Sequence, residues 1–182
     1  MTEVQLTPVA DSPNNDAFEA VVETYFQTQG YITSAGKWFW VREPTKQQRG
    51  YQDIDVLAVN GVDTIIISAT SNLDDKLNCK DGTPSNEKLI KLKNHFERIR
   101  FYLSRVDQYK WMVSKPRKVR FFVAYNHAFK KTLTPIKKCL HDAQIEIVSA
   151  KEILEFLNDY TRKPNLKIQN PLLRTIQLLG KN

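Results

Sequence analysis

Polar residues flank two neighbouring apolar runs in the middle of the chain. Asp53 and Asp55 stand at the start of the first run, and Ser68 and Thr70 stand at the end of the second. The dipeptide Asn60-Gly61 between the runs predicts a tight β-hairpin, because a type I′ turn requires positive φ at both central residues. Side chains alternate along strands, so the two carboxylates and two hydroxyls are expected on one face, at the open end of the hairpin. Carboxylate oxygens gathered in this way suit a divalent cation.

The register of the hairpin follows from a two-residue loop. It places Val59 opposite Val62, Asp55 opposite Ile66, and Asp53 opposite Ser68. A plainer explanation of Asp55 is that it caps a turn at the entrance of a strand. The adjacent apolar run counts against this, because burial of a lone charge is costly.

This arrangement resembles the catalytic hairpin of the PD-(D/E)xK, or restriction-endonuclease-like, nuclease superfamily. In that family an Asp near the start of one strand is followed, on the next strand, by an acid-x-Lys triplet. Asp55 matches the first acid, and the triplet falls on Ser68-Ala69-Thr70. The hairpin and the first acid therefore fit the family, whereas Ser68 replaces the second acid and Thr70 replaces the Lys.

The resemblance implies phosphodiester hydrolysis with Mg²⁺ or Mn²⁺ held by carboxylates, and with a Lys that orients or deprotonates the nucleophile. Asp55 would be the principal metal ligand, with Glu19 on the first helix or Asp53 as the second. Glu19 has an alternative role, because Asp16 and Glu19 have the spacing of a capping box. The candidate catalytic set is Asp55, Glu19, Asp53, Ser68 and Thr70, and the candidate metal ligands are Asp55 and Glu19.

A migrated acid or Lys could replace the missing members of the triplet. Lys88 or Lys91 on the second predicted helix is the expected source of the Lys. Other residues within reach, none with a spacing that singles it out, are Asp74, Asp75, Lys76, Lys80 and Glu87.

Apolar periodicity and capping signals predict the elements that position these residues. A helix is expected at 16–29, a strand at 31–41, the hairpin, a loop at 71–82, and a helix that opens at Thr83-Pro84. Further elements are expected at 119–124 (strand), 133–143 (helix), 144–148 (strand), 149–160 (helix with a capping box) and from Asn170-Pro171 (short helix).

This order predicts an α/β fold, a restriction-endonuclease-like αβββαβ core with a mixed central sheet flanked by helices, plus a C-terminal helical extension. The expected organisation is a loose N-terminal arm over 1–15, the restriction-endonuclease-like domain over 16–162, and an extension with a short helix over 163–182.

Charge is distributed unevenly along the chain. The formal net charge is +7, yet residues 1–36 contain five acids and no Lys or Arg. A basic body of this kind favours a polyanionic partner. Lys88, Lys91, Arg98 and Arg105 are expected along the exposed side of the second helix, where they would bind nucleic acid unless they are only a solvated helix face.

Composition disfavours several other classes. The two cysteines, Cys79 and Cys139, form no C-x-x-C motif, so a disulfide framework or zinc site is not expected. There is no apolar run that could span a membrane and no signal peptide, which predicts a cytoplasmic protein without a membrane partner. No nucleophile motif or phosphate-binding glycine loop is found.

Three functions fit these observations. The leading expectation is a nucleic-acid-binding protein, with DNA as the expected partner, whose nuclease-like active site is degenerate. The first alternative is an active Mg²⁺-dependent DNA endonuclease with migrated catalytic residues. The second is a non-enzymatic interaction or oligomerisation module, for instance a homodimer formed through the apolar C-terminal helix.

Overall fold

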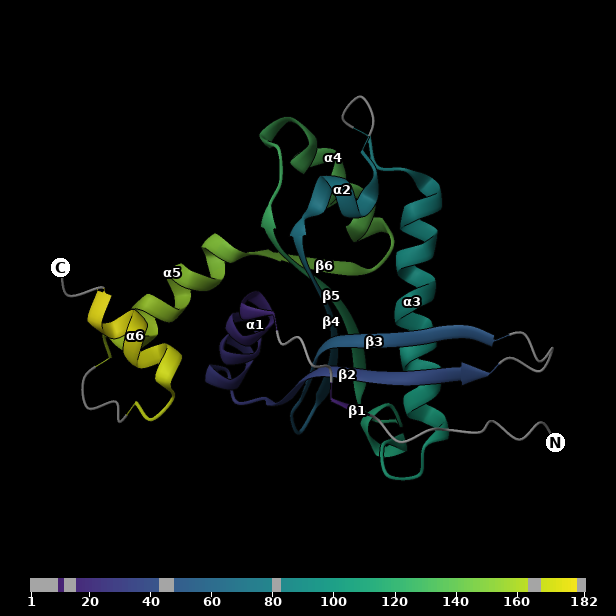
Figure 1. Ribbon diagram of the computed structural model, residues 1–182, viewed down its shortest axis with the longest axis horizontal. Helices are drawn as coiled ribbons and strands as arrows, with labels where there is room; N and C mark the ends of the chain where they lie inside the picture. Colours follow the sequence, from purple (N-terminus) through teal and green to yellow (C-terminus); the bar gives the residue numbers. More distant parts are fainter. Residues whose placement is uncertain (1–9, 12–15, 43–47, 80–82, 164–167, 180–182) are drawn as a thin grey trace.

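A single mixed sheet organises the chain. The computed structural model describes residues 10–11, 16–42, 48–79, 83–163 and 168–179, and only the backbone of 10–11, 38–42 and 48–52. Six strands lie in the order β1-β2-β3-β4-β5-β6; the first four pair antiparallel and the last three parallel (Figure 1). The strands are β1 (Ala10–Asp11), β2 (Ile32–Arg42), β3 (Gln48–Val59), β4 (Asp63–Asn72), β5 (Lys118–His127) and β6 (Ile145–Ser149).

Helices cover both faces of this sheet. On one face lie α1 (Ala17–Thr28), α5 (Ala150–Thr161) and α6 (Pro171–Leu179), packed around Val56, Ile65 and Ile67. On the other lie α2 (Leu73–Leu77), α3 (Asn86–Arg105), the 3-10 helix η1 (Lys110–Met112) and α4 (Lys130–Asp142), packed around Leu57, Ile66 and Val123. Figure 1 shows α1 and α3 on opposite sides of β4 and β5. The predicted mixed α/β fold with the order αβββαβ and a C-terminal helix is confirmed.

Local capping explains most helix boundaries. Asp16 accepts a hydrogen bond from the Phe18 N–H at the start of α1, and Gly30, with φ of 85°, follows its end. The capping box of Ser149 and Glu152 opens α5 as predicted. Asn170 caps α6 through the N–H groups of Leu172 and Leu173.

Three predicted boundaries were wrong. The helix α3 begins at Asn86, so Thr83-Pro84 precedes it rather than opening it. The helix α4 begins at Lys130 and contains Pro135 in its interior. The expected loop at 71–82 holds the short helix α2, and residues 80–82 of that loop lie outside the described part of the chain.

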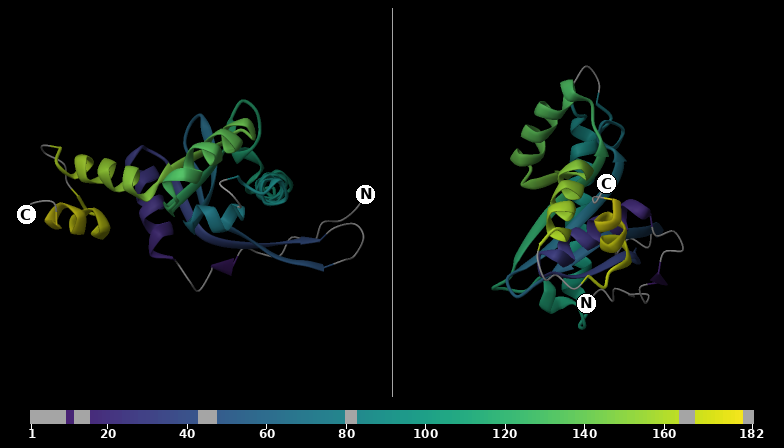
Figure 2. Two further views of the ribbon diagram at one scale, coloured as in Figure 1. Left: turned by 90° about the horizontal axis from the view of Figure 1, so that it is seen from above. Right: turned by 90° about the vertical axis from the view of Figure 1, so that its left-hand side faces the viewer.

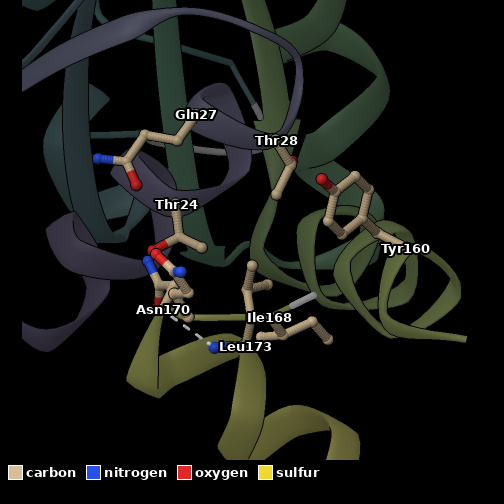
Figure 3. A pocket seen from close by; sticks show the side chains of 8 residues that line it. Thr24, Gln27, Thr28, Tyr160, Ile168, Asn170 and Leu173 are labelled. Atoms are coloured by element: carbon tan, nitrogen blue, oxygen red, sulfur yellow. Dashed lines mark hydrogen bonds between the residues drawn. The ribbon is translucent and has the colours of Figure 1, made fainter. Parts of the chain in front are cut away.

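The N-terminal and C-terminal segments contact the central domain in different ways. Of the predicted N-terminal arm, residues 1–9 and 12–15 lie outside the described part, and Ala10–Asp11 pairs with β2. In the C-terminal extension, Leu173 is buried and Ile176 packs against the core. A small pocket of about 190 Å³, lined by polar and apolar side chains, lies where α1, α5 and α6 meet (Figure 3). Part of the apolar side of α6 is thus used within the chain, whereas Leu178 and Leu179 are exposed. None of the described helices is long and apolar enough to cross a membrane.

The hairpin between β3 and β4 differs from the predicted one by two residues. Val59 pairs with Thr64 rather than with Val62, and the Asn60 N–H donates to the carbonyl of Asp63 at 3.0 Å. Asn60 Oδ1 accepts from the N–H groups of Val62 and Asp63 at 2.8 and 2.7 Å, so the Asn side chain folds the turn.

The corrected register changes the predicted partners but leaves Asp55 and Ser68 on one face, while Asp53 lies beyond the point where alternation along β3 is broken. Predicted pairs of Asp55 with Ile66 and of Asp53 with Ser68 are replaced by a register that places Asp55 level with Ser68. A shift of two residues returns each side chain to its original face, whereas a shift of one would have reversed it.

The turn chemistry gives a test of this register. Gly61 does not adopt positive φ, and a Cβ added there meets no atom within 4 Å. We therefore expect Gly61→Ala to leave the free energy of unfolding unchanged or to raise it by up to about 1 kcal/mol. Asn60→Ala should lower it by about 1 kcal/mol, because two turn N–H groups lose their acceptor. Urea denaturation measures both; marked destabilisation by Gly61→Ala would support the type I′ turn instead.

Candidate active site

The sheet divides where the polar residues gather. The ladder between β3 and β4 ends at the pair of Val56 and Ile67; beyond it β3 pairs only with β2, and β4 only with β5. We call this point the fork. Figure 1 shows β2 and β3 running across the direction of β4 and β5, and Figure 2 shows them projecting from the body. Backbone and side-chain groups at the fork must therefore find partners other than the ladder.

A local distortion in β2 and β3 accompanies the fork. Ala35 pairs with Val56 and Lys37 with Ile54, which places Gly36 level with Asp55. Gly36 has φ of 59°, a conformation that favours glycine. On either side of Asp55 the burial pattern changes, since Ile54 belongs to the α3 face and Val56 to the α1 face. The irregular backbone turns Asp55 toward β4.

Asp55 bridges the fork with its side chain. Its Oδ2 accepts the Ala69 N–H at 2.7 Å and the Ser68 hydroxyl at 3.0 Å. Burial raises the pKa of Asp55, while the ammonium of Lys76 and these two donors oppose the rise. The carboxylate replaces the backbone acceptor that β3 no longer supplies to β4.

Lys76 completes a chain of three side chains. Its Nζ donates to Ser68 Oγ at 3.0 Å, and that hydroxyl donates in turn to Asp55. Ser68 is almost fully buried, whereas Lys76 reaches it from an exposed position on α2. An ammonium group thus lies beside the Asp at the fork although the strand triplet contains no Lys.

A buried carboxylate holds α2 in place. Asp74 Oδ2 accepts the Phe129 N–H at 2.8 Å, and Asp74 Oδ1 accepts the hydroxyl of Thr132. Both partners lie at the start of α4, so Asp74 joins the two helices. Asn72 caps α2 through the N–H groups of Asp74 and Asp75. Asp74, one of the candidate migrated acids, therefore has a structural role that fixes the position of Lys76.

Glu19 brings a second carboxylate from α1. Its pKa is raised from 4.5 to about 7, first by burial and then by the negative charges of Asp55, Asp16 and Asp53. Glu19 Oε2 is buried and accepts no hydrogen bond from the described residues. The start of α1 is capped by the Asp16 carboxylate, which accepts the Phe18 N–H, and Glu19 Oε2 does not accept the Asp16 N–H that a capping box would give it.

His95 approaches the same acids from α3. Burial lowers its pKa, and the cations Lys76 and Arg98 lower it further, while Asp53 opposes the change. His95 is thus close enough to interact with Asp53 and Lys76, and its helix covers the same face of the sheet as α2, opposite to α1. Five elements, α1, β3, β4, α2 and α3, contribute ionisable or hydroxyl groups to the fork.

The remaining predicted residues are placed as follows. Thr70 donates its hydroxyl to the carbonyl of Asn72 at 3.1 Å, within the last residues of β4. Lys88 and Lys91 are exposed on α3, and Lys91 forms an ion pair with Glu87 at 2.6 Å. Arg98 is half-buried near His95, and Arg105 lies over the ring of Phe101 with its Cζ 4.9 Å from the centroid. Lys76, rather than Lys88 or Lys91, is the lysine that the structure brings to Asp55.

The donor set fits one hard divalent cation. No three His, Cys, Asp or Glu side chains of the described residues are grouped as ligands of a metal ion. Mg²⁺, however, is commonly held by one or two protein carboxylates and completes its shell with water. A cation bound here would give the buried Glu19 Oε2 a partner and would offset the burial that raises the pKa of Asp55.

Comparison with known proteins leaves the family unassigned. No family model and no curated protein match the chain. A solved crystal structure described as a protein of unknown function, AF1548, is similar over 92% of this chain and 79% of its own length, with 13% identity and a TM-score of 0.48. At this level the likeness supports no statement about function.

Two site residues were not singled out from the sequence. Lys76 is one of several possible migrants in the sequence, and no pattern in the sequence assigns His95 to the site. The sequence contains a signal for the short helix that carries Lys76. Asn72 is a favourable N-cap residue, and Leu73 and Leu77 are an apolar pair four residues apart, as on one face of a helix. His95 has no comparable signal, because its approach depends on how α3 crosses the sheet.

The raised pKa of Glu19 predicts a pH-dependent stability in buffers without divalent ions. Between its ordinary value of 4.5 and about 7, the folded carboxyl keeps a proton that the unfolded chain loses, so stability falls as pH rises through this window. Glu19→Gln carries no such penalty. We compare the free energy of unfolding of Glu19→Gln with that of the wild type. The variant should be more stable relative to the wild type at pH 8 than at pH 4.5, by on the order of 1 kcal/mol once solvent screening is allowed for.

Urea denaturation of both proteins across this pH range provides the measurement. A difference between Glu19→Gln and the wild type that stays constant with pH would show that the carboxyl is not held protonated in the folded protein.

Proposed function

We propose that this chain is a divalent-cation-dependent nuclease related to the PD-(D/E)xK superfamily, with DNA as the expected substrate. The observation that carries the proposal is the position of Lys76, whose ammonium lies beside Asp55 through Ser68. Together with Glu19 this supplies the two carboxylates and one amine that the resemblance requires. The missing acid and Lys of the strand triplet are then replaced from α1 and α2.

Each residue has a distinct part in this reaction. Glu19 and Asp55 would hold the cation through carboxylate oxygens, and the cation, when bound, polarises the phosphate and lowers the pKa of a water. The Lys76 ammonium has three N–H donors, of which Ser68 takes one, so it can also orient a phosphate oxygen or the attacking water. Ser68 is buried and neutral, and its part is to hold Lys76 and Asp55 together.

The surface beside the fork suits a polyanion. The exposed side of α3 carries Lys88, Lys91 and Arg105, and Arg98 lies closer to the fork beside His95. Lys91 forms an ion pair with Glu87, so Lys88 and Arg105 are better candidates for phosphate contacts. A cytoplasmic location forms part of the proposal and agrees with the free thiols of Cys79 and Cys139.

A second candidate is a nucleic-acid-binding protein that no longer cleaves. Ser68 favours it, because a neutral hydroxyl occupies the place of the second carboxylate of the triplet and already bonds both Asp55 and Lys76. A site with only two carboxylates would then hold a cation weakly, while the basic side of α3 would still bind phosphates.

Cleavage of supercoiled plasmid in Mg²⁺ or Mn²⁺ separates the two candidates. We expect nicking by the wild type, and a decrease of at least about 100-fold in Asp55→Ala and in Lys76→Ala, as for loss of a metal ligand or proton-transfer group. Asp75→Ala, which changes the exposed neighbour of Lys76, should retain activity, and so should Thr70→Ala. Plasmid binding without any nicking by the wild type would leave the second candidate.

The salt dependence of binding tests the role of α3. For a labelled duplex, each phosphate contact contributes a slope of about 0.9 in the plot of log affinity against log salt. Lys88→Ala combined with Arg105→Ala should lower the slope by up to about 1.8. Lys151→Ala, an exposed lysine on α5, should leave it unchanged. Fluorescence anisotropy between about 50 and 200 mM KCl supplies the slopes; identical slopes for all three proteins would exclude α3 as the binding face.

A further inference from the structure

The segment after α3 is a compact basic lobe with an aromatic residue at its surface. We call residues 106–118 the Trp111 lobe. Its backbone is held by a series of local bonds, including those of Lys110 N–H to Val106 and Met112 N–H to Tyr109, both at 2.8 Å. The buried Thr64 hydroxyl donates to the Met112 carbonyl and so fastens the lobe to β4. The lobe is a fixed part of the fold rather than a loose connection.

Trp111 is both exposed and held in one orientation. Trp111 is 48% exposed, which is unusual for so large an aromatic residue. The indole Nε1 donates to the Gln108 carbonyl at 2.9 Å. The guanidinium of Arg117 lies over the ring, with Cζ 5.0 Å from the centroid, and Arg117 also donates to the Asn60 carbonyl. An ordered flat ring therefore faces solvent beside a cation.

Charge around this ring is mainly positive. Lys115 and Lys118 are exposed, and Arg117 is half-buried against the indole. Lys110 pairs with Asp107 at 3.0 Å and contributes less. Just before the lobe, Arg105 covers Phe101, a second aromatic residue that is 46% exposed. Two pairs of an exposed ring and an arginine thus lie between the last turns of α3 and the start of β5.

The lobe and the fork lie on the same side of the sheet. Thr64, Ile66 and Ser68 are every second residue of β4 and share one face, so the anchor of the lobe and the buried serine of the fork are about 13 Å apart along the strand. Figure 1 shows α3 running along this side. The half-buried Arg98 near His95 and the exposed Arg105 near the end of the helix place two cations along α3 from the fork to the lobe.

We propose that the Trp111 lobe binds single-stranded nucleic acid by stacking an unpaired base on Trp111, with Lys115, Arg117 and Lys118 neutralising the adjacent phosphates. This rests on the proposed nucleic-acid function and specifies its substrate as one that contains a single-stranded segment. Rigid aromatic rings among cations are the general device for binding single strands, because every base has a face that can stack. In a duplex the base faces are already stacked on one another and offer no such contact.

Binding of labelled oligonucleotides to the full chain tests the proposal. Anisotropy titrations use a single-stranded DNA, a single-stranded RNA of the same sequence, and the DNA duplex. Trp111→Ala should weaken single-strand binding by about 5- to 100-fold, as for loss of one stacked base, and change duplex binding by less than about 2-fold. Trp111→Phe, which keeps an aromatic ring, should recover most of the affinity. The DNA and RNA arms show which single strand is preferred.

Phe129→Ala serves as a matched control, because Phe129 is a 53% exposed aromatic residue next to Lys130 and Lys131 but lies at the start of α4. It should bind as the wild type does. Single-strand binding unaffected by Trp111→Ala, or an equal loss for single strand and duplex, would overturn the stacking proposal while leaving the nuclease proposal intact. Failure of the wild type to bind any of the three ligands would overturn the nucleic-acid function itself. Thermal unfolding followed by circular dichroism confirms that Trp111→Ala remains folded.

Discussion

The hydrogen bond between the Asp55 carboxylate and the Ala69 N–H is the interaction on which the candidate site depends. A sheet that divides leaves backbone donors without acceptors, and each buried donor left unpaired is costly. Asp55 satisfies the Ala69 N–H with a side chain, so β3 can turn away from β4 without that loss. The same carboxylate brings a negative charge to the point where the strands part. Two effects on the Asp55 carboxyl therefore oppose each other, because the hydrogen bond from Ala69 favours the ionised form and burial disfavours it.

The electrostatics of the fork follow from the number of acids gathered there. The charges of Asp53 and Asp55 raise the pKa of Glu19, and that of Asp53 raises the pKa of Asp55, where the Lys76 ammonium opposes the rise. Carboxylates with perturbed pKa values are frequent at functional sites. A cation or the phosphates of a substrate with its counterions would relieve the repulsion. The fork is thus poised for a charged ligand rather than for an apolar one.

The sequence predicted the layers of the fold and half of the candidate site. Local rules sufficed where the signal was local: Asp16, Gly30 and the Ser149–Glu152 box set helix ends as expected. They failed at the hairpin, where the Asn60 side chain closes the turn instead of the backbone geometry that Asn60-Gly61 favours. Asp55 and Ser68 still came together, because an even shift of register preserves the face of each residue. Lys76 and His95 could not be selected, since their positions depend on contacts between helices distant in sequence.

The anchoring of α2 by Asp74 has a consequence for how such proteins are recognised. The amine at the fork belongs to Lys76 of α2, and Asp74 joins this helix to α4 through residues more than fifty positions away in sequence. An ammonium group can therefore lie at the fork although β4 has no lysine there. The two strands alone contain no lysine at this point, yet an acid and an amine lie on either side of the Ser68 hydroxyl. The chemistry available at the fork is therefore visible only when the positions of atoms in space are compared, with the order of residues along a strand as a secondary guide.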